Sequence, residues 1–245
     1  MPAPGAGDMS VGVGLQLFSV REQCERDLEA TLQFVAELGY DGVELASLHG
    51  HTASDLRTLL DELGLAVAGR HVGLDADVAS LQEEMRVLGC DRVAVAWIDP
   101  PETVAARDAA VEQIAALAAR TDLRLGFHNH WAEVHRFEDG ASLLERLPED
   151  VWLELDLGWA WHAGESPLQL LEWARGRTPL VHLKDFRSRD TREFVPVGDG
   201  AVGYETIVPR AVELGVEWLI VEQDELDRPW REALGRSIDA VRVTA

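Results

Sequence analysis

The sequence is poor in the features of secreted and membrane-spanning proteins. Only two cysteines, Cys24 and Cys90, occur in 245 residues. They are too few for a disulfide framework and lack a metal-binding spacing, which suits a reducing compartment. No apolar run approaches the roughly 20 residues that cross a bilayer, and the N-terminus lacks a basic start and hydrophobic run. We therefore expect a cytoplasmic protein in which residues 1–10 form a flexible tail.

Positive charge is also scarce. The chain has 22 Lys and Arg against 44 Asp and Glu, a formal net charge of −22, and its single lysine is Lys184. A nucleic acid backbone would be repelled by most of such a surface. Nucleic acid is thus not expected as a partner, and most of the carboxylates are expected to serve solubility.

The 47% hydrophobic content supplies a sizeable core, and no Pro, Ser or Gly-rich linker divides the chain. Short apolar runs alternate with amphipathic stretches from end to end, which predicts eight strand–helix pairs in one domain, residues 11–245. Ser166-Pro167 is a good helix start, because Ser caps and Pro suits the first turn. The expected strands are 11–18, 42–45, 66–72, 92–97, 123–128, the start of 151–162, 180–184 and 218–222; the expected helices are 25–38, 54–63, 78–88, 101–120, 141–147, one from 167, 204–214 and 229–241.

A Leu-Gly pair recurs where the expected helices end, at 38–39, 63–64, 88–89 and 214–215. Glycine there accepts the left-handed conformation that returns the chain to the next strand. Eight such units predict a (β/α)₈ TIM barrel. An open doubly wound sheet is the competitor, but Gly12-Val-Gly14 precedes the end of the first strand and does not lead into a helix as a phosphate loop would.

Polar residues stand at the expected strand ends, which meet at one mouth in a barrel. The first half of the chain offers mostly hydrogen-bonding groups, whereas the second half offers three carboxylates and an imidazole. This donor set suits Mn²⁺, Mg²⁺, Co²⁺ or Zn²⁺. The residues are Gln16, Glu44, His71, Trp97, His128, His130, Glu133, Asp156, His182, Lys184 and Glu222.

Each candidate ligand also has a structural explanation. Asp156 ends an apolar strand, yet it could simply cap the following turn. His182 lies between two apolar residues, where an isolated histidine is usually a core residue. Glu222 ends the run Leu219-Ile-Val221 and is the third candidate. Together these three favour a shared cation, since buried carboxylates without one would repel each other.

The fifth strand end leaves a choice of ligand. Glu133 could be a ligand or a solvated loop residue, and His128 or His130 could supply the donor instead. Glu44, at the second strand, stands apart from the other carboxylates around the barrel, so it could bind substrate, support a ligand or play a structural part.

An ordered set of short motifs runs through the chain: Gly42-Val-Glu-Leu45, Phe127-His-Asn-His130 with Glu133, Leu155-Asp156 with Ala163-Gly164, His182-Leu-Lys-Asp185, Pro196-Val-Gly-Asp-Gly200 and Val221-Glu222. With these motifs the chain resembles the xylose isomerase-like TIM barrels, in particular the sugar phosphate isomerase/epimerase family, from about Gly14 to the last helix. The resemblance implies one divalent metal ion, Mn²⁺ first, held by Glu133, Asp156, His182 and Glu222.

The resemblance also implies the chemistry. The metal would polarise the carbonyl of a keto sugar, sugar phosphate or polyol, while Glu133 and Glu222 exchange a proton through an enediolate, giving isomerisation or epimerisation. The small-molecule substrate would be the main partner, and a homodimer or homotetramer is left open. Expected substrate-binding residues are Glu44, His71, His128, His130, Trp159, Lys184 and Arg187.

Three alternatives are weighed against this function. A dehydratase of the inosose dehydratase type would use the same metal but expel water. A sugar-binding barrel without catalysis would predict a broken ligand set, whereas all four candidates are present. A nuclease of the apurinic endonuclease type would need further histidines, and the third position after Asp156 is Trp159. Trp159 and Trp161 suit either the core or stacking on a sugar ring.

Overall fold

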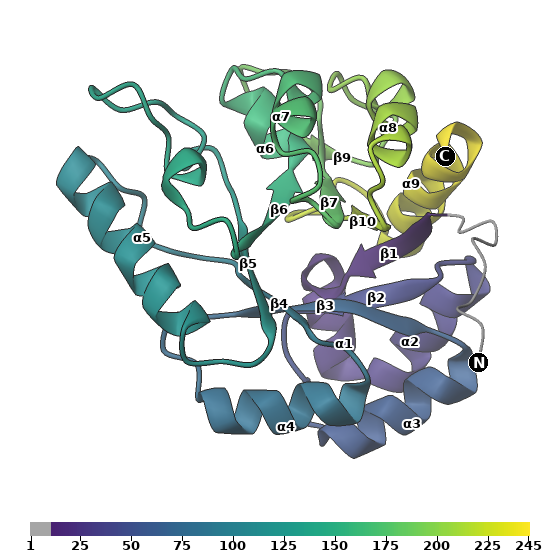
Figure 1. Ribbon diagram of the computed structural model, residues 1–245. Helices are drawn as coiled ribbons and strands as arrows, with labels where there is room; N and C mark the ends of the chain where they lie inside the picture. The colour runs from purple at the N-terminus through teal and green to yellow at the C-terminus, as the bar shows by residue number, and fades with distance from the viewer. Residues whose placement is uncertain (1–10) are drawn as a thin grey trace, which may run out of the picture.

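The expected TIM barrel is confirmed. The computed structural model describes residues 11–245, and the expected tail, residues 1–10, lies outside the described residues. Eight parallel strands close into a barrel in the order β1-β10-β7-β6-β5-β4-β3-β2 (Figure 1). The barrel strands are β1 Gly12–Gln16, β2 Gly42–Leu45, β3 Ala66–Val72, β4 Arg92–Val95, β5 Arg124–His128, β6 Trp152–Asp156, β7 Leu180–Leu183 and β10 Trp218–Val221.

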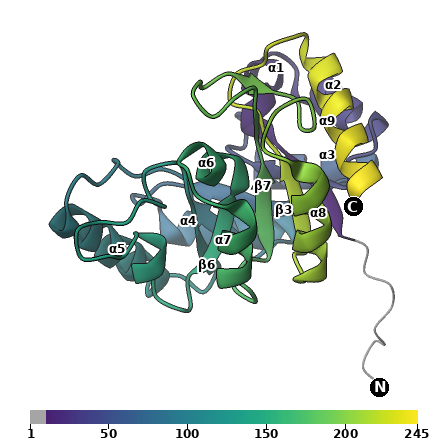
Figure 2. The ribbon, with the colours of Figure 1, turned by 90° about the horizontal axis from the view of Figure 1, so that it is seen from above.

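Helices surround the barrel and cover the outer faces of its strands (Figures 1 and 2). Within residues 11–245, no helix is long and apolar enough to cross a membrane. The helices are α1 Arg21–Arg26, α2 Leu28–Glu37, α3 Ala53–Leu63, α4 Val78–Leu88, α5 Val104–Ala118, α6 Leu157–His162, α7 Pro167–Trp173, α8 Tyr204–Glu213 and α9 Trp230–Thr244, with 3₁₀ turns η1 Leu17–Val20 and η2 Leu144–Arg146.

The Leu-Gly signal is confirmed at every helix end where it was expected. The φ angles of Gly39, Gly64, Gly89 and Gly215 are 88°, 69°, 72° and 85°. These are left-handed conformations that other residues rarely adopt. The recurrence therefore identified four chain reversals of the barrel.

The α-helix expected over 141–147 is wrong. Only the short turn η2 forms there. Ser142 and Glu145 cap each other: the Ser142 N–H donates to Glu145 Oε2 at 2.8 Å, and the Glu145 N–H donates to Ser142 Oγ at 3.3 Å. Pro148 follows within one turn and pushes Leu147 out of the helical region, so the helix cannot extend.

Two further differences lie near the mouth of the barrel. The helix expected over 25–38 is interrupted at Asp27, whose side chain caps α2 by accepting the Ala30 N–H at 3.0 Å. After β7 the chain forms a two-stranded antiparallel hairpin, β8 Asp185–Phe186 with β9 Phe194–Val195, which the sequence did not indicate. This hairpin brings residues after β7 back over the strand ends.

The interior of the barrel is apolar at one end and polar at the other. Trp152 and Trp218 fill the end where the strands begin, and they form a small core with Ala68, Leu180 and Ile220. Glycines of β1, β2 and β5 face these two indoles, because a Cβ at those positions would collide with the rings. Polar side chains occupy the remaining interior towards the carboxyl ends of the strands.

Candidate metal centre

Two groups of buried side chains inside the barrel have ligand atoms close enough to hold a cation. In each group the ligand atoms all lie within 4.8 Å of one another. The two groups share two histidines. We call His128, Asp156, His182 and Glu222 the Asp156 cluster, and His71, His128, Glu154 and His182 the Glu154 cluster.

Asp156 ends β6 and is fully buried. Its Oδ1 atom accepts the Trp159 N–H at 2.7 Å, so the capping role considered from the sequence is real. Its Oδ2 atom has no hydrogen-bond partner among residues 11–245 and lies 3.3 Å from Lys184 Nζ. One carboxylate therefore both starts α6 and keeps a second oxygen that pairs with Lys184 but accepts no hydrogen bond from the described residues.

Lys184 is the positive charge of the Asp156 cluster. Its ammonium lies 3.3 Å from Asp156, 3.0 Å from Glu222 and 2.7 Å from Asp224, and the side chain is 1% exposed. Burial alone would lower the pKa of Lys184, but Glu222, Asp224 and Asp156 outweigh it and raise that pKa above its usual value. The lysine thus stays charged and compensates carboxylates that would otherwise repel each other.

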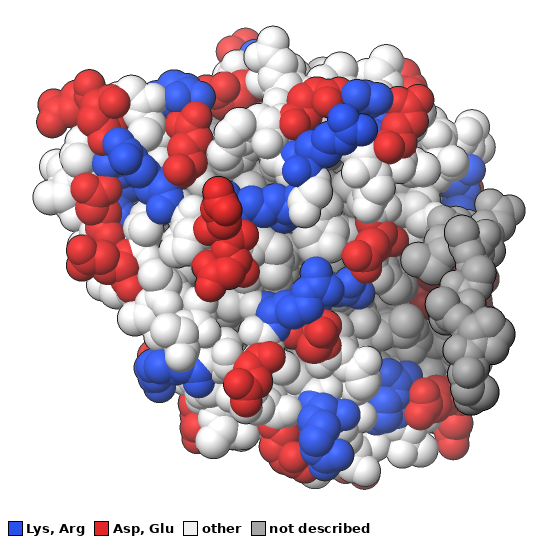
Figure 3. Space-filling view, viewed as in Figure 1, with Lys and Arg blue, Asp and Glu red and all other residues white. Residues whose placement is uncertain are grey.

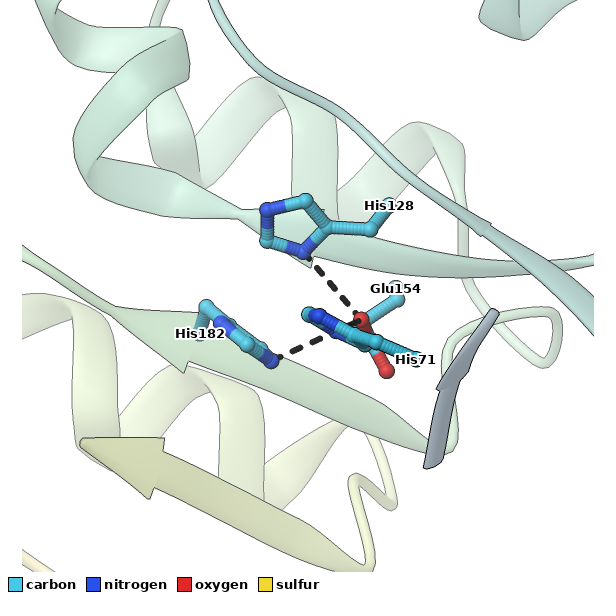
Figure 4. Close-up of side chains that lie close together, drawn as sticks. All are labelled: His71, His128, Glu154 and His182. Carbon is cyan, nitrogen blue, oxygen red and sulfur yellow. Dashed lines mark hydrogen bonds and ion pairs between the residues drawn. The ribbon is translucent and has the colours of Figure 1, made fainter. Parts of the chain in front are cut away.

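The Glu154 cluster gathers three imidazoles around one carboxylate oxygen (Figure 4). Glu154 Oε2 lies 2.6 Å from His71 Nε2, 3.1 Å from His128 Nδ1 and 3.5 Å from His182 Nε2. Glu44 joins them, because its Oε2 atom lies 2.6 Å from His182 Nε2. Glu44, Glu154 and His182 are all fully buried.

The carboxylates of the two clusters differ in pKa. Burial raises the pKa of Asp156 to about 6, against the opposing effect of Lys184 and His182. Burial and the nearby charge of Glu44 raise the pKa of Glu154 to about 7. Burial alone would also raise the pKa of Glu44, but the charges of His71 and His182 outweigh it and lower the value to about 2.

The residues present fit a divalent cation at the Asp156 cluster. Two carboxylates and two imidazoles are a donor set that Mn²⁺ and Zn²⁺ accept. Asp156 Oδ2 is buried and, within the described part of the chain, without a hydrogen-bond partner. Such an atom is costly unless something binds it. The side-chain chemistry alone does not select one metal.

Glu133 belongs to neither cluster of the described residues. It is 2% exposed, and its Oε2 atom accepts the His130 N–H at 2.9 Å. The turn after β5 therefore directs this carboxylate at the backbone, and His128 is the fifth-strand residue that the structure brings to the clusters. The ligand role of Glu133 stays a prediction, which requires its carboxylate to turn away from the His130 amide.

A cavity of about 680 Å³ opens above the clusters. Its wall is rich in aromatic rings, and Glu222 and Asp224 give it a carboxylate side. The lining residues are Phe18, Arg21, His71, Ala96, Trp97, His128, His130, Trp131, Trp159, Arg192, Phe194, Glu222, Asp224 and Glu225.

The expected substrate-binding residues divide into three groups. His71, His128, His130 and Trp159 line the cavity, and their contact with a substrate stays a prediction. Glu44 and Lys184 lie buried among the clusters. Arg187 is outside the cavity lining, and its guanidinium pairs with Glu193 at 3.2 Å and Asp227 at 3.7 Å.

Three residues of the clusters and the cavity were not predicted from the sequence: Glu154, Asp224 and Arg192. Glu154 had a readable signal, because it stands two residues before Asp156 in a strand, and alternate strand residues share a face. Arg192 reaches the cavity only through the unexpected β8–β9 hairpin, where its guanidinium lies 3.9 Å from the centre of the Trp131 ring. Asp224 follows the last barrel strand in a loop, and no sequence pattern marked it.

Charged side chains of both signs are spread over the face shown in Figure 3, and the absence of a nucleic acid partner stays a prediction. Acidic and basic side chains alternate there, without a continuous basic patch. A phosphate backbone would find no cationic track on this face.

Comparison with known proteins gives the same architecture. A curated relative, inosose dehydratase from Geobacillus kaustophilus (strain HTA426), is 26% identical over 247 residues, covering 80% of each chain. A crystal structure of a sugar phosphate isomerase/epimerase from Parabacteroides distasonis ATCC 8503 superposes with a TM-score of 0.78 at 19% identity, covering 99% of this chain and 98% of the other.

A D-allulose 3-epimerase from Methylomonas sp. in complex with D-allulose has a TM-score of 0.71 at 14% identity, over 97% and 98% of the two chains. Identities this low show the shared fold alone. The sequence profile of the xylose isomerase-like TIM barrel matches residues 32–242, most of the chain. The protein therefore belongs to the xylose isomerase-like TIM barrel family.

Proposed function

We propose that the protein is a divalent-metal-dependent isomerase or epimerase of a keto sugar, sugar phosphate or polyol. The observation that carries the proposal is the Asp156 cluster: two carboxylates and two imidazoles converge at the base of a cavity with aromatic walls. Family membership supports the proposal, since the family includes sugar isomerases and epimerases.

Asp156, His182 and Glu222 would hold the metal, with the fourth position filled by His128 or, after rearrangement, by Glu133. When bound, the ion supplies a Lewis acid that polarises a substrate carbonyl and favours the enediolate. His182 Nδ1 lies 2.8 Å from Glu222 Oε2, and this contact orients both groups. The other step, proton transfer, would be carried out by side chains of the protein.

Glu222 lines the cavity and is the proposed acid/base group. Burial would raise its pKa, but Lys184 and His182 outweigh burial and lower it, so the carboxylate is ionised yet a weaker base than a free glutamate. Glu133 is the proposed second group. Burial raises the pKa of Glu133, which suits a carboxyl that holds a proton to return, but its carboxylate now binds the His130 amide.

The cavity walls suit a sugar. Trp97 is 55% exposed and offers a ring face for stacking on the apolar side of a pyranose or furanose, whereas Trp159 is buried and Arg192 covers a face of Trp131. Arg21 also lines the cavity and donates to the carbonyl oxygens of Phe18 and Asp224 at 2.9 and 3.0 Å. The remaining N–H groups of Arg21 and Arg192 are the ones offered to a substrate hydroxyl or phosphate.

A second candidate function is a dehydratase of the inosose dehydratase type, which the 26% identical relative favours. The first half of the reaction would be the same proton abstraction next to a carbonyl. The second half would expel a hydroxyl from the neighbouring carbon, with a proton donor beside it. Lys184, an ammonium 3.0 Å from Glu222, is the group whose position suits that donor.

Proton exchange in deuterated water separates these functions. With Mn²⁺ and a panel of ketoses and inososes, we expect deuterium to enter at one sugar carbon without loss of water; loss of water would establish the dehydratase. Glu222→Gln should slow deuterium exchange by a factor of about 10²–10⁴, the usual contribution of one acid/base group. Glu205→Gln, on the exposed side of α8, is the matched control. Undiminished exchange in Glu222→Gln would contradict the assigned base.

A further inference from the structure

Two imidazoles of the barrel interior have a carboxylate oxygen within 4.0 Å of each ring nitrogen. His182 Nδ1 lies 2.8 Å from Glu222, and its Nε2 lies 2.6 Å from Glu44. His128 Nδ1 lies 3.1 Å from Glu154, and its Nε2 faces Asp156 Oδ2 at 4.0 Å. Each ring therefore presents one nitrogen to the Asp156 cluster and the other to a carboxylate behind it.

Spacing alone does not separate the two clusters as metal sites. Zinc ligands at about 2.0 Å from a tetrahedral ion stand about 3.3 Å apart. His71 Nε2 and Glu154 Oε2 are 2.6 Å apart, and His182 Nδ1 and Glu222 Oε2 are 2.8 Å apart, so each cluster contains one pair at hydrogen-bond distance. The Glu154 cluster differs in having one carboxylate, whereas the Asp156 cluster has two. An ion on each side of His182 would also require its ring to lose both protons.

We propose that Glu44 and Glu154 are positioning residues for the metal centre. Glu44 accepts a hydrogen bond from His182 Nε2, which holds the His182 ring in the tautomer that offers Nδ1 to the ion. Glu154 Oε2 lies 3.1 Å from His128 Nδ1 and orients that ring by its charge rather than by a hydrogen bond. Histidine ligands commonly donate their second N–H to a carboxylate, which fixes the ring and raises its basicity. The inference rests on the proposed metal site, but on no particular substrate.

The two carboxylates are themselves held in place. Gln16 Nε2 donates to Glu44 Oε2 at 2.8 Å, and His71 contacts Glu154 at 2.6 Å. Gly69 makes room for Glu44, because a Cβ there would lie 2.9 Å from Glu44 Oε1. Three strands beyond the ligands thus contribute to the orientation of the two histidines.

The burial of Glu44 and Glu154 indicates a role other than stabilising the fold. Glu44 and Glu154 are both fully buried, and each has one oxygen with no hydrogen-bond partner in the described chain. Removing carboxylates from water costs several kcal/mol, and apolar replacements of buried ionic groups are often neutral or stabilising. A positioning role predicts that metal affinity suffers more than folding when they are neutralised.

Metal titration tests the proposal. Glu44→Gln and Glu154→Gln should weaken Mn²⁺ binding by about 10–100-fold, the usual effect of losing such a partner. The thermal midpoint of the metal-free variants should stay close to that of the parent protein. Glu205→Gln is the control. Affinity unchanged in both cluster variants would overturn the proposal, as would two bound ions per chain that fall to one in Glu154→Gln.

A measurement on the unmodified protein covers the case in which the variants do not fold. In ¹⁵N NMR of the Zn²⁺-loaded protein, His182 should carry its proton on Nε2 and bind metal through Nδ1. The reverse assignment would overturn the proposal. Neither readout uses turnover, so a protein that binds metal as described but converts no sugar would contradict the proposed function and leave the positioning role intact.

Discussion

The Asp156 and Glu154 clusters are built from the same residue types but differ in carboxylate content and charge compensation. Both reach the cavity, the first through Glu222 and the second through His71, but the Asp156 cluster has two carboxylates and the ammonium of Lys184 beside it. The Glu154 cluster has one carboxylate and no lysine or arginine partner among residues 11–245, and its charge is balanced by imidazoles. The difference teaches that proximity of donors alone does not define a metal site: the number of carboxylates and their compensation favour the ion at one cluster and a supporting role for the other.

Asp156→Asn should give the largest loss of metal affinity. A small loss would contradict the proposed difference between the two clusters. The substitution removes the charge of the carboxylate while keeping the cap to Trp159, since Asn also accepts at a helix start. We expect divalent metal affinity to fall by more than about 100-fold, well beyond the effect of Glu154→Gln. Isothermal titration of both variants side by side makes the measurement. Equal losses would mean that the clusters are not functionally distinct.

Lys184→Met tests whether this lysine compensates the carboxylates of the Asp156 cluster. It leaves Asp156, Glu222 and Asp224 without their cation, and breaking a buried pair this way costs about 3–5 kcal/mol. Chemical denaturation should show that loss in the metal-free protein and a partial recovery with Mn²⁺, because the ion replaces the missing charge. Stability unaffected by the substitution would show that Lys184 does not compensate these carboxylates.

The pH dependence of metal binding gives a smaller effect. The pKa of Asp156 is raised from 3.8 to about 6, so protons compete with the ion for this oxygen below that pH. Apparent affinity should fall about tenfold between pH 7 and pH 5. For the metal-free fold the sign is opposite: the raised pKa contributes stability that is present below pH 3.8 and lost as pH rises through 6. Asp156→Asn, measured in parallel, should lose this part of the pH dependence of metal affinity and of the stability of the metal-free protein.

The barrel could be predicted from local signals. Each Leu-Gly pair marks a real helix end, and the strands 42–45 and 66–72 have the expected bounds. The α-helix predicted over 141–147 does not form, because Ser142 and Glu145 cap each other and Pro148 stops the helix within one turn. The β8–β9 hairpin depends on contacts between residues that no periodic pattern links, so its cavity residue Arg192 could not be foreseen.

The ligands could be predicted only in part. Asp156, His182 and Glu222 end barrel strands, and strand ends meet whatever their distance in sequence. Glu133 lies in a turn, where backbone geometry rather than strand direction aims the side chain, and here it binds the His130 amide. The contact of Glu44 with His182 could not be predicted without knowing which strand lies across the barrel, because the two residues are 138 positions apart.

The most direct test is the position of the ion. Crystals of the protein grown with Mn²⁺ or Zn²⁺ should show one anomalous peak per chain, about 2.0–2.2 Å from ligand atoms of Asp156, His182 and Glu222. The same map should show Glu44 still within hydrogen-bond distance of His182 Nε2. A peak between His71 and Glu154, or no peak at saturating metal, would contradict the assignment of the metal to the Asp156 cluster.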